Sequence, residues 1–266
     1  MRHLPAFLLV LLALVAGGCG AMRSAVSPVA PPLDVFLLIG QSNMAGRGTV
    51  EASDREPTPG VYALTADGGW ALARDPLHFD KPRVAGVGPG LAFGRAMRAA
   101  RPGRRVGLVP GAVGGTSIVR WVPGGADDAT GTHPYDDAIA RAHAVLDAQG
   151  VRLAGVLWHQ GESDGQMPAD EYETRLAELV GRLRAEFSDP ALPFVAARLA
   201  PSYVARHAGA ATVNAAIDRL ARLPATAVVT TEGLADGGDG THLDAASARE
   251  LGRRYAAAMR RLLAES

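Results

Sequence analysis

The sequence predicts one large α/β domain in which a mostly parallel β-sheet is covered by helices on both faces. Short aliphatic runs alternate with longer amphipathic segments, and each aliphatic run is apolar throughout. Alternating strands and helices favour a doubly wound sandwich, and continuous apolar runs are typical of parallel strands buried on both faces. A chain of 266 residues is long enough for one sizeable core, so one large domain is favoured over two small ones.

About five strands follow from this pattern. They are expected at Asp34–Ile39, Arg105–Val109, Leu153–Trp158, Phe194–Arg198 and Ala227–Thr230. The helices between and after them are expected at Gly90–Ala100, Tyr135–Gln149, Ala169–Glu186, His207–Arg222 and Ala245–Ala264. The segment Thr49–Val87 is rich in Pro, Gly and charged residues, and we expect it to form an excursion over the active face.

The N-terminus has the pattern of an export signal. Arg2 and His3 precede "LPAFLLVLLALVAGG", an apolar run that is too short for a comfortable membrane span and that ends in small residues. Residues 1–18 are therefore predicted to be a signal peptide, and the mature protein is expected outside the cytoplasm, in the periplasm or at the cell surface.

Cys19, the only cysteine, follows directly and resembles the lipidated cysteine of a bacterial lipobox, although Ala16 stands where leucine is usual. The alternative is an ordinary signal peptide cut nearby, with Cys19 incidental. The Ala-, Ser- and Pro-rich residues 19–32 are predicted to be a flexible tether, and residues 33–266 the folded domain. A lipid on Cys19 is the one membrane contact that the sequence suggests.

Charge and motif content narrow the function classes. Lys plus Arg and Asp plus Glu both number 27, and no basic run with interleaved aromatic residues occurs, so nothing favours a nucleic-acid partner. His159, Glu162 and Asp164 are close in sequence but lack a recognisable metal-ligand spacing. Neither a phosphate-binding loop nor a dinucleotide fingerprint is present, so no metal and no cofactor is predicted. The sequence does not determine the oligomeric state.

Polar clusters follow four of the predicted strands. They are "GQSNMAGRG", "PGAVGGTSI", "HQGESDG" and "DGGDGTHLD". In an open parallel sheet, ligands bind outside the carboxyl ends of the strands. The four clusters are therefore expected to converge on one site.

Ser42, His242 and Asp239 have the residue types of a serine hydrolase triad. Ser42 follows the first strand between glycines, where the alternative role is a helix cap. His242 lies in "DGTHL" with Asp239 three residues before it, so a loop can bring the carboxylate to the imidazole. Asp236 and Asp244 are alternative partners for that imidazole.

"GESDG" matches the Gly-x-Ser-x-Gly nucleophile elbow, which makes Ser163 a competing nucleophile. Only about two sheet strands precede it, and Gln166-Met167-Pro168 separates it from the next helix. An elbow runs straight into its helix after several strands. Ser42 is therefore favoured. Backbone amides of "GAVGGTS" and the side-chain amide of Gln160 are candidate oxyanion donors, with turn glycines and helix capping as the alternative.

The blocks "LIGQSNMAGRG", "VGPGLAFG", "GLVPGAVGGTSIVRW", "GVLWHQGESD" and "DGTHLD" resemble, in this order, those of the sialate O-acetylesterase and acetylxylan esterase-like branch of the SGNH hydrolases, carbohydrate esterase family 6. The resemblance covers the chain from about Leu33 onward. It implies a flavodoxin-like three-layer α/β/α fold and metal-free hydrolysis of acetyl esters, often on sugars.

Carried over by motif, the resemblance implies Ser42 as nucleophile, His242 as general base and Asp239 as its orienting acid. It implies an oxyanion hole made by the Ser42 amide, the Gly115 amide and the Gln160 side chain. Gln41, Asn43 and Glu162 are expected to support the site. Many relatives have an aromatic residue where His159 stands, so a substrate contact or a second base is open for His159.

The expected function is removal of O-acetyl groups from a carbohydrate, a polysaccharide or a sialic acid type of substrate. Trp121 and Tyr135 are candidate contacts to a sugar ring, and both are equally suited to the core. Two other classes stay open: a non-catalytic, lipid-anchored carbohydrate-binding protein, and a serine hydrolase for another ester class such as a lipase or thioesterase.

Overall fold

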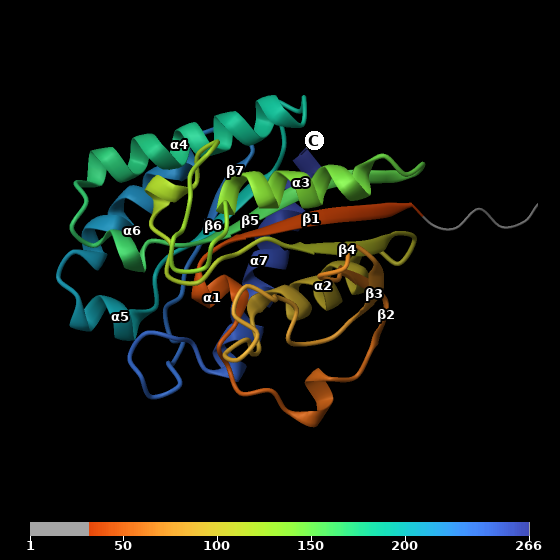
Figure 1. The fold of residues 1–266 in the computed structure, drawn as a ribbon, viewed down its shortest axis with the longest axis horizontal. Helices are drawn as coiled ribbons and strands as arrows, with labels where there is room; N and C mark the ends of the chain where they lie inside the picture. Colours follow the sequence, from red (N-terminus) through yellow and green to blue (C-terminus); the bar gives the residue numbers. More distant parts are fainter. Residues whose placement is uncertain (1–31, 266) are drawn as a thin grey trace, which may run out of the picture. The chain divides into compact units, whose positions relative to one another are not determined.

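The computed structural model describes residues 32–265 and contains one mixed sheet of seven strands in the order β3-β2-β4-β1-β5-β6-β7 (Figure 1). The strands are β1 (Leu33–Gly40), β2 (Thr58–Leu64), β3 (Trp70–Ala73), β4 (Arg105–Pro110), β5 (Val151–His159), β6 (Phe194–Ala197) and β7 (Thr226–Val229). Every neighbouring pair is parallel except β2 and β3, which are antiparallel. The predicted α/β class is confirmed.

Helices cover both faces of the sheet (Figure 1). They are α1 (Ser42–Ala45), α2 (Pro89–Ala100), α3 (Pro134–Leu146), α4 (Ala169–Glu186), α5 (Pro201–Arg206), α6 (Ala210–Arg219) and α7 (Ala245–Glu265). One core cluster joins the sheet to α2 and α7, and a second joins its other face to α3, α4 and α6. The molecule is thus a three-layer sandwich.

Strand β1 is at the centre of both cores. All eight of its residues are buried. Phe36 and Leu38 belong to the α2/α7 core, whereas Leu37 and Ile39 belong to the α3/α4/α6 core. Because successive side chains of a strand point to opposite faces, a continuous apolar run fills both layers at once. This arrangement explains why β1 reads as uninterrupted hydrophobic sequence.

The segment Thr49–Val87 is more than the predicted excursion: its Lys81 and Val84 lie at the same cavity as Ser42, and it also adds β2 and β3 to one edge of the sheet. The first half of β2 carries Pro59 and Gly60, residues that are depleted in strands. Strand β3 has four residues, and its Trp70 and Leu72 are among the exposed large hydrophobic side chains. Neither strand has the buried aliphatic run by which the other five were recognised.

The expected helix at His207–Arg222 is also shorter than predicted. Helix α5 ends at Arg206, α6 begins at Ala210, and the chain finishes this region with a 3₁₀ turn at Leu220–Arg222. Gly209 stands between the two helices and packs directly against the Gly165 carbonyl, where a Cβ would lie 1.6 Å from that oxygen. This close backbone contact requires glycine at position 209.

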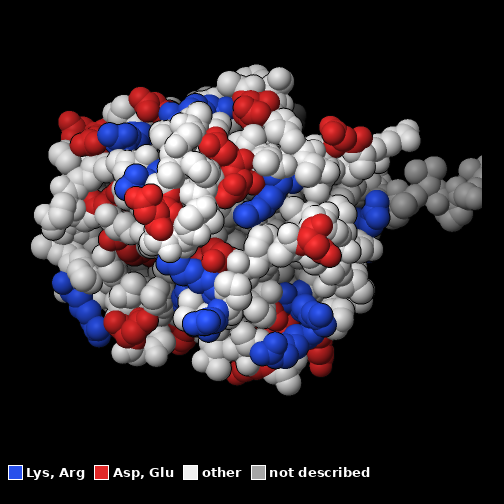
Figure 2. All heavy atoms as spheres, in the orientation of Figure 1, with Lys and Arg blue, Asp and Glu red and all other residues white. Residues whose placement is uncertain are grey.

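The predicted signal peptide, the Cys19 lipidation site and the tether lie outside the described residues. None of the helices between residues 32 and 265 combines the length and the apolar character that a membrane span requires. On the face in Figure 2, basic and acidic side chains are interspersed, in keeping with the zero formal net charge of the sequence.

One carboxyl group is deeply buried beside this framework. Asp75 is 3% exposed, and its Oδ1 lacks a hydrogen-bond partner among residues 32–265. Burial and the nearby Asp54 carboxylate raise the pKa of Asp75 from 3.8 to about 8, and Arg95 and Arg249 offset only part of this rise. The folded protein therefore holds this side chain in its protonated form at neutral pH.

We expect Asp75→Asn to stabilise the protein increasingly as the pH rises. The folded state keeps the proton on Asp75 up to about pH 8, whereas the unfolded chain releases it near pH 3.8. The contribution of Asp75 to the free energy of unfolding is therefore full below pH 3.8 and is lost as the pH rises to about 8. Urea unfolding between pH 5 and 9, with exposed Asp128→Asn as control, measures the difference. If the difference in the free energy of unfolding between Asp75→Asn and the wild type stayed constant over this range, the expectation would be contradicted.

Candidate active site

The loops after β1, β4 and β5 and the loop before α7 meet at one cavity of about 410 Å³. Its lining includes Gln41, Ser42, Gly114, Gly115, Ser163 and His242. These residues come from all four polar clusters of the sequence. The convergence expected at the carboxyl ends of the strands is present.

Gly40 makes the close approach of β1 and β5 feasible. Its φ is +127°, and a Cβ at this position would lie 2.1 Å from the carbonyl oxygen of His159. Only glycine adopts this conformation at so short a distance. The next amide, that of Gln41, donates to the same carbonyl at 2.8 Å. The chain then turns at once into α1, so that Ser42 begins this helix at the cavity.

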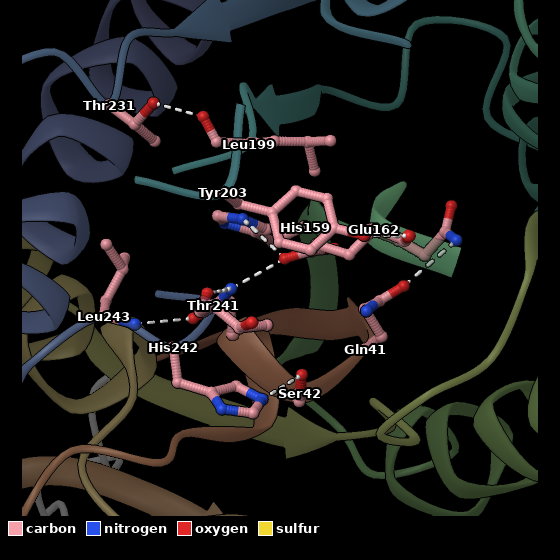
Figure 3. Close-up of polar contacts among 12 residues, drawn as sticks. Gln41, Ser42, His159, Glu162, Leu199, Tyr203, Thr231, Thr241, His242 and Leu243 are labelled. Carbon is pink, nitrogen blue, oxygen red and sulfur yellow. Dashed lines mark hydrogen bonds and ion pairs between the residues drawn. The ribbon is translucent and has the colours of Figure 1, made fainter. Parts of the chain in front are cut away.

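Ser42, His242 and Asp239 form a continuous chain of polar contacts (Figure 3 shows the Ser42 and His242 pair). His242 Nε2 lies 3.0 Å from Ser42 Oγ, and His242 Nδ1 lies 2.6 Å from Asp239 Oδ2. Asp239 Oδ1 accepts from the backbone amides of Thr241 and His242, both at 2.8 Å. The imidazole is therefore held between a hydroxyl and a carboxylate.

The Asp239 carboxylate stays ionised far into the acid range. Partial burial raises the pKa of Asp239, but hydrogen bonds from the His242 amide, the Thr241 amide and the imidazole outweigh it and lower this pKa from 3.8 to about 2. A carboxylate that is charged throughout the neutral range favours a proton on Nδ1 of His242. Nε2 is then free to accept a proton from Ser42.

Two alternative carboxylates are engaged elsewhere. Asp236 Oδ1 accepts from the amides of Gly238 and Gly240, each at 2.8 Å. Asp244 Oδ1 accepts from the amide of Ser247 at 2.7 Å, in the first turn of α7. Among the described residues, Asp239 is the carboxylate that contacts the His242 ring.

Asn43 joins the segment of Ser42 to the loop of His242. Its Nδ2 donates to the Thr241 carbonyl at 3.0 Å and to Glu162 Oε1 at 2.6 Å, and its Oδ1 accepts from the Leu243 amide at 3.0 Å. Thr241 and Leu243 directly precede and follow His242. One buried side chain thus holds the backbone on both sides of the imidazole.

A group of residues that the sequence reasoning missed holds the turn at Gly114 and Gly115. Asp80 Oδ2 accepts from the Gly114 amide at 2.9 Å and forms an ion pair with Arg47 at 3.2 Å. Lys81 Nζ donates to the Gly114 carbonyl at 2.8 Å. Arg47 ends the "GQSNMAGR" run, but Asp80 and Lys81 lie in "HFDKP", which carries no recognisable signal of its own.

This turn leaves a backbone donor at the cavity. Gly115 has a φ of +86°, a conformation that favours glycine. Its amide has no acceptor among residues 32–265, and the same is true of the Ser42 amide at the first position of α1. Both residues line the cavity. Both amides are unpaired backbone donors of the kind that can stabilise an anionic oxygen.

Gln160 is not placed as an oxyanion donor, which corrects the expectation for its side chain. The residue is fully buried. Its Nε2 carries two hydrogens but already faces three acceptors: Thr116 O at 2.9 Å, Gln41 Oε1 at 3.2 Å, and Asp164 Oδ2. Its Oε1 accepts from the Tyr172 hydroxyl at 3.0 Å. No hydrogen of this amide remains for a ligand.

The three candidate substrate contacts are all buried, and the interpretation of them as such contacts is wrong. Trp121 is 1% exposed and donates from its indole nitrogen to Thr116 Oγ1, and its ring packs edge-on against Trp158. Tyr135 belongs to the same core. An apolar aromatic residue at a strand end or helix start fits a core as well as a groove, and burial decides between them.

His159 is completely buried as well, beneath Glu162. Its Nε2 lies 3.7 Å from Glu162 Oε1, too far for a hydrogen bond. Burial lowers the pKa of His159, and the Glu162 carboxylate offsets part of this effect. Figure 3 shows His159 and Glu162 beside Tyr203, whose hydroxyl donates to the Glu162 carbonyl at 2.6 Å. Because His159 is fully buried and does not line the cavity, it cannot reach a ligand there as a second base.

Ser163, the competing nucleophile, has a different environment from Ser42. Its hydroxyl donates to the Gly115 carbonyl at 3.0 Å, and no imidazole among the described residues contacts it. Residues 32–265 also contain no group of three or more His, Cys, Asp and Glu side chains arranged to hold a metal ion. The cavity thus contains one serine with a base.

Comparisons with known protein sequences match this chain to carbohydrate esterases. Residues 32–261 match the sequence model of a family described as carbohydrate esterase, sialic acid-specific acetylesterase. A probable carbohydrate esterase of Arabidopsis thaliana is 35% identical over 194 residues, which are 65% of this chain and 71% of that protein.

Solved structures share the fold. An X-ray structure of a protein from Arabidopsis thaliana has a TM-score of 0.74 at 31% identity, over 87% of this chain and 99% of that one. A carbohydrate acetylesterase from Xanthomonas citri has a TM-score of 0.69 at 22% identity, over 88% of this chain and 57% of that one.

We expect Asn43→Ala to loosen the loop that carries His242. The Leu243 amide loses its acceptor and the Thr241 carbonyl its donor, so the variant should lose about 1–3 kcal/mol in the free energy of unfolding. Hydrogen exchange should accelerate at the Leu243 amide. The amide of Phe194 in β6, which donates to the Ala225 carbonyl outside this loop, serves as the internal control. Unchanged protection of Leu243 would show that Asn43 does not hold this loop.

Proposed function

Because the chain belongs to the family of carbohydrate esterases described as sialic acid-specific acetylesterases, we propose that it is a serine esterase that removes O-acetyl groups from a carbohydrate. The observation that carries the proposal is the chain of contacts from Ser42 through His242 to Asp239 at the wall of the cavity. The base lies within hydrogen-bonding distance of the nucleophile on one side and of the orienting acid on the other, as acyl transfer requires.

In the first half of the reaction, Ser42 Oγ attacks the acetyl carbonyl carbon while His242 Nε2 takes the hydroxyl proton. The carbonyl oxygen becomes an oxyanion, which the amides of Ser42 and Gly115 stabilise. The C–O bond to the sugar then breaks, and His242 returns the proton to the leaving sugar oxygen. Ser42 now carries the acetyl group.

In the second half, a water molecule attacks the acetyl-serine carbonyl and His242 takes its proton. The second tetrahedral intermediate uses the same oxyanion donors. It collapses with cleavage of the bond to Ser42 Oγ, which receives the proton from His242, and acetic acid leaves and ionises in water. Asp239 holds the imidazole in one orientation and stabilises its positive charge through both halves.

The lining of the cavity supports a short acyl group on a polar alcohol. Arg47, Lys81, Glu162 and Thr241 line it, whereas Val84 is the one aliphatic side chain larger than alanine in that lining. Long acyl chains need extensive apolar surface, and sugar hydroxyls need hydrogen-bonding groups. A lipase is therefore disfavoured, and an acetylated polysaccharide or an O-acetylated sialic acid suits the site better.

We expect Ser42→Ala to reduce hydrolysis of an aryl acetate and of an acetylated sugar by at least ~10³-fold, because the nucleophile is lost. Ser163→Ala is the matched control. It removes one hydrogen bond to the Gly115 carbonyl and should cost no more than about tenfold. Wild-type rates in Ser42→Ala, or complete loss only in Ser163→Ala, would refute the assignment of the nucleophile.

A panel of acetylated xylan, O-acetylated sialic acid, long-chain esters and thioesters tests the substrate class. The proposal expects turnover of the acetylated carbohydrates and little of the long-chain esters. An intact fold that hydrolyses no ester and binds the deacetylated sugars would instead support a carbohydrate-binding role.

A further inference from the structure

We propose that the side-chain amide of Gln41 is the third donor of the oxyanion hole, and that Gln160 positions it without touching the substrate. The inference rests on the proposed esterase function, because it assigns one more group to that reaction. It replaces the assignment that the sequence resemblance gave to Gln160.

The hydrogen bonds of Gln160 fix which atom of Gln41 faces the cavity. The Thr116 carbonyl cannot donate, so the Gln160 atom that lies 2.9 Å from it must be the amide nitrogen. Tyr172 donates to the other end, the Gln160 oxygen. Gln160 Nε2 has no lone pair to offer, so the Gln41 atom 3.2 Å from it is the oxygen Oε1 and not the amide nitrogen, which would find no acceptor there. The remaining atom of the Gln41 amide is therefore its nitrogen, with both hydrogens.

This nitrogen is unengaged and reaches the cavity. No described residue accepts a hydrogen bond from Gln41 Nε2, and the atom is not among the buried side-chain atoms that lack a partner. Gln41 as a whole is only 3% exposed, and it lines the cavity together with Ser42 and Gly115. The small accessible surface of its amide is thus turned into the site. In Figure 3 the Gln41 oxygen points to its hydrogen-bond partner and the nitrogen lies on the opposite side.

Gln41 and Ser42 line the same cavity at the start of α1. Gln41 directly precedes Ser42, and its carbonyl accepts from the amides of Met44 and Ala45, which holds its backbone at the start of α1. Its Oε1 is tied to Gln160, which is itself held by Thr116 and Tyr172. An amide fixed at one end and free at the other is preorganised, which is what stabilisation of a developing oxyanion requires.

No proton moves to or from Gln41. As Ser42 Oγ adds to the carbonyl carbon, the carbonyl π electrons become a lone pair on oxygen, and Gln41 Nε2 donates a hydrogen bond to it. The Ser42 and Gly115 amides donate to the same oxygen. When the tetrahedral intermediate collapses, the double bond re-forms and the hydrogen bonds weaken.

Gln41→Glu and Gln41→Met are the test variants. Glutamate keeps an oxygen acceptor for Gln160 but loses both donor hydrogens, and methionine keeps the length of the side chain without charge or donor. Both should lower kcat for an aryl acetate by ~10²–10³-fold with KM changed by less than about threefold, because the donor acts on the oxyanion and not on the bound ester. Affinity for a boronic acid that forms a tetrahedral adduct with Ser42 should fall in parallel.

The roles of the two glutamines are distinguished by the variant Gln160→Asn, made alone and in combination with Gln41→Met. If Gln160 acts through Gln41, the double variant should be no slower than Gln41→Met; two independent donors would give multiplied losses. Multiplied losses, or a kcat within about threefold of wild type in folded Gln41→Glu and Gln41→Met, would overturn the inference. Failure of the proposed function itself is distinguishable, because wild type would then lack Ser42-dependent esterase activity altogether.

Discussion

The structure of the site depends on one side chain, that of Asn43. It links residues almost 200 positions apart in the chain, because it bonds to the backbone on both sides of His242 while it follows Ser42 directly. Asn43 thus ties the segment of Ser42 directly to the loop that carries His242. Glu162 accepts the second hydrogen of that amide, so the third polar cluster is tied into the same contact.

This link is effective because both of its ends are anchored in the sheet. Strand β1 lies between β4 and β5 and is buried along its whole length, so Ser42 follows the end of a fully buried central strand. The Gly114 and Gly115 turn after β4 is held separately by Asp80 and Lys81. Each part of the cavity has its own fixed support, and a polar ligand meets a site in which the donors are already oriented.

The sequence was sufficient for the fold class and for the convergence of the four clusters, because buried parallel strands carry an unmistakable aliphatic pattern. It was insufficient for β2 and β3, whose Pro59, Gly60 and exposed Trp70 break that pattern. Trp121 and Tyr135 were ambiguous because residue type alone does not tell a buried ring from a groove wall. The role of Gln160 was misjudged because the atom that an amide turns toward a cavity depends on hydrogen-bond partners far away in sequence.

The proposal that Ser42 is the nucleophile can be tested by identifying the serine that carries the acetyl group. Wild-type protein would be acid-quenched during turnover of an aryl acetate, digested and analysed by peptide mass spectrometry. We expect one acetylated serine, Ser42, in the wild-type protein and no acetylated serine in Ser42→Ala. Acetyl ester hydrolysis with the label on Ser163, or with acetate released in a variant that lacks Ser42, would contradict it.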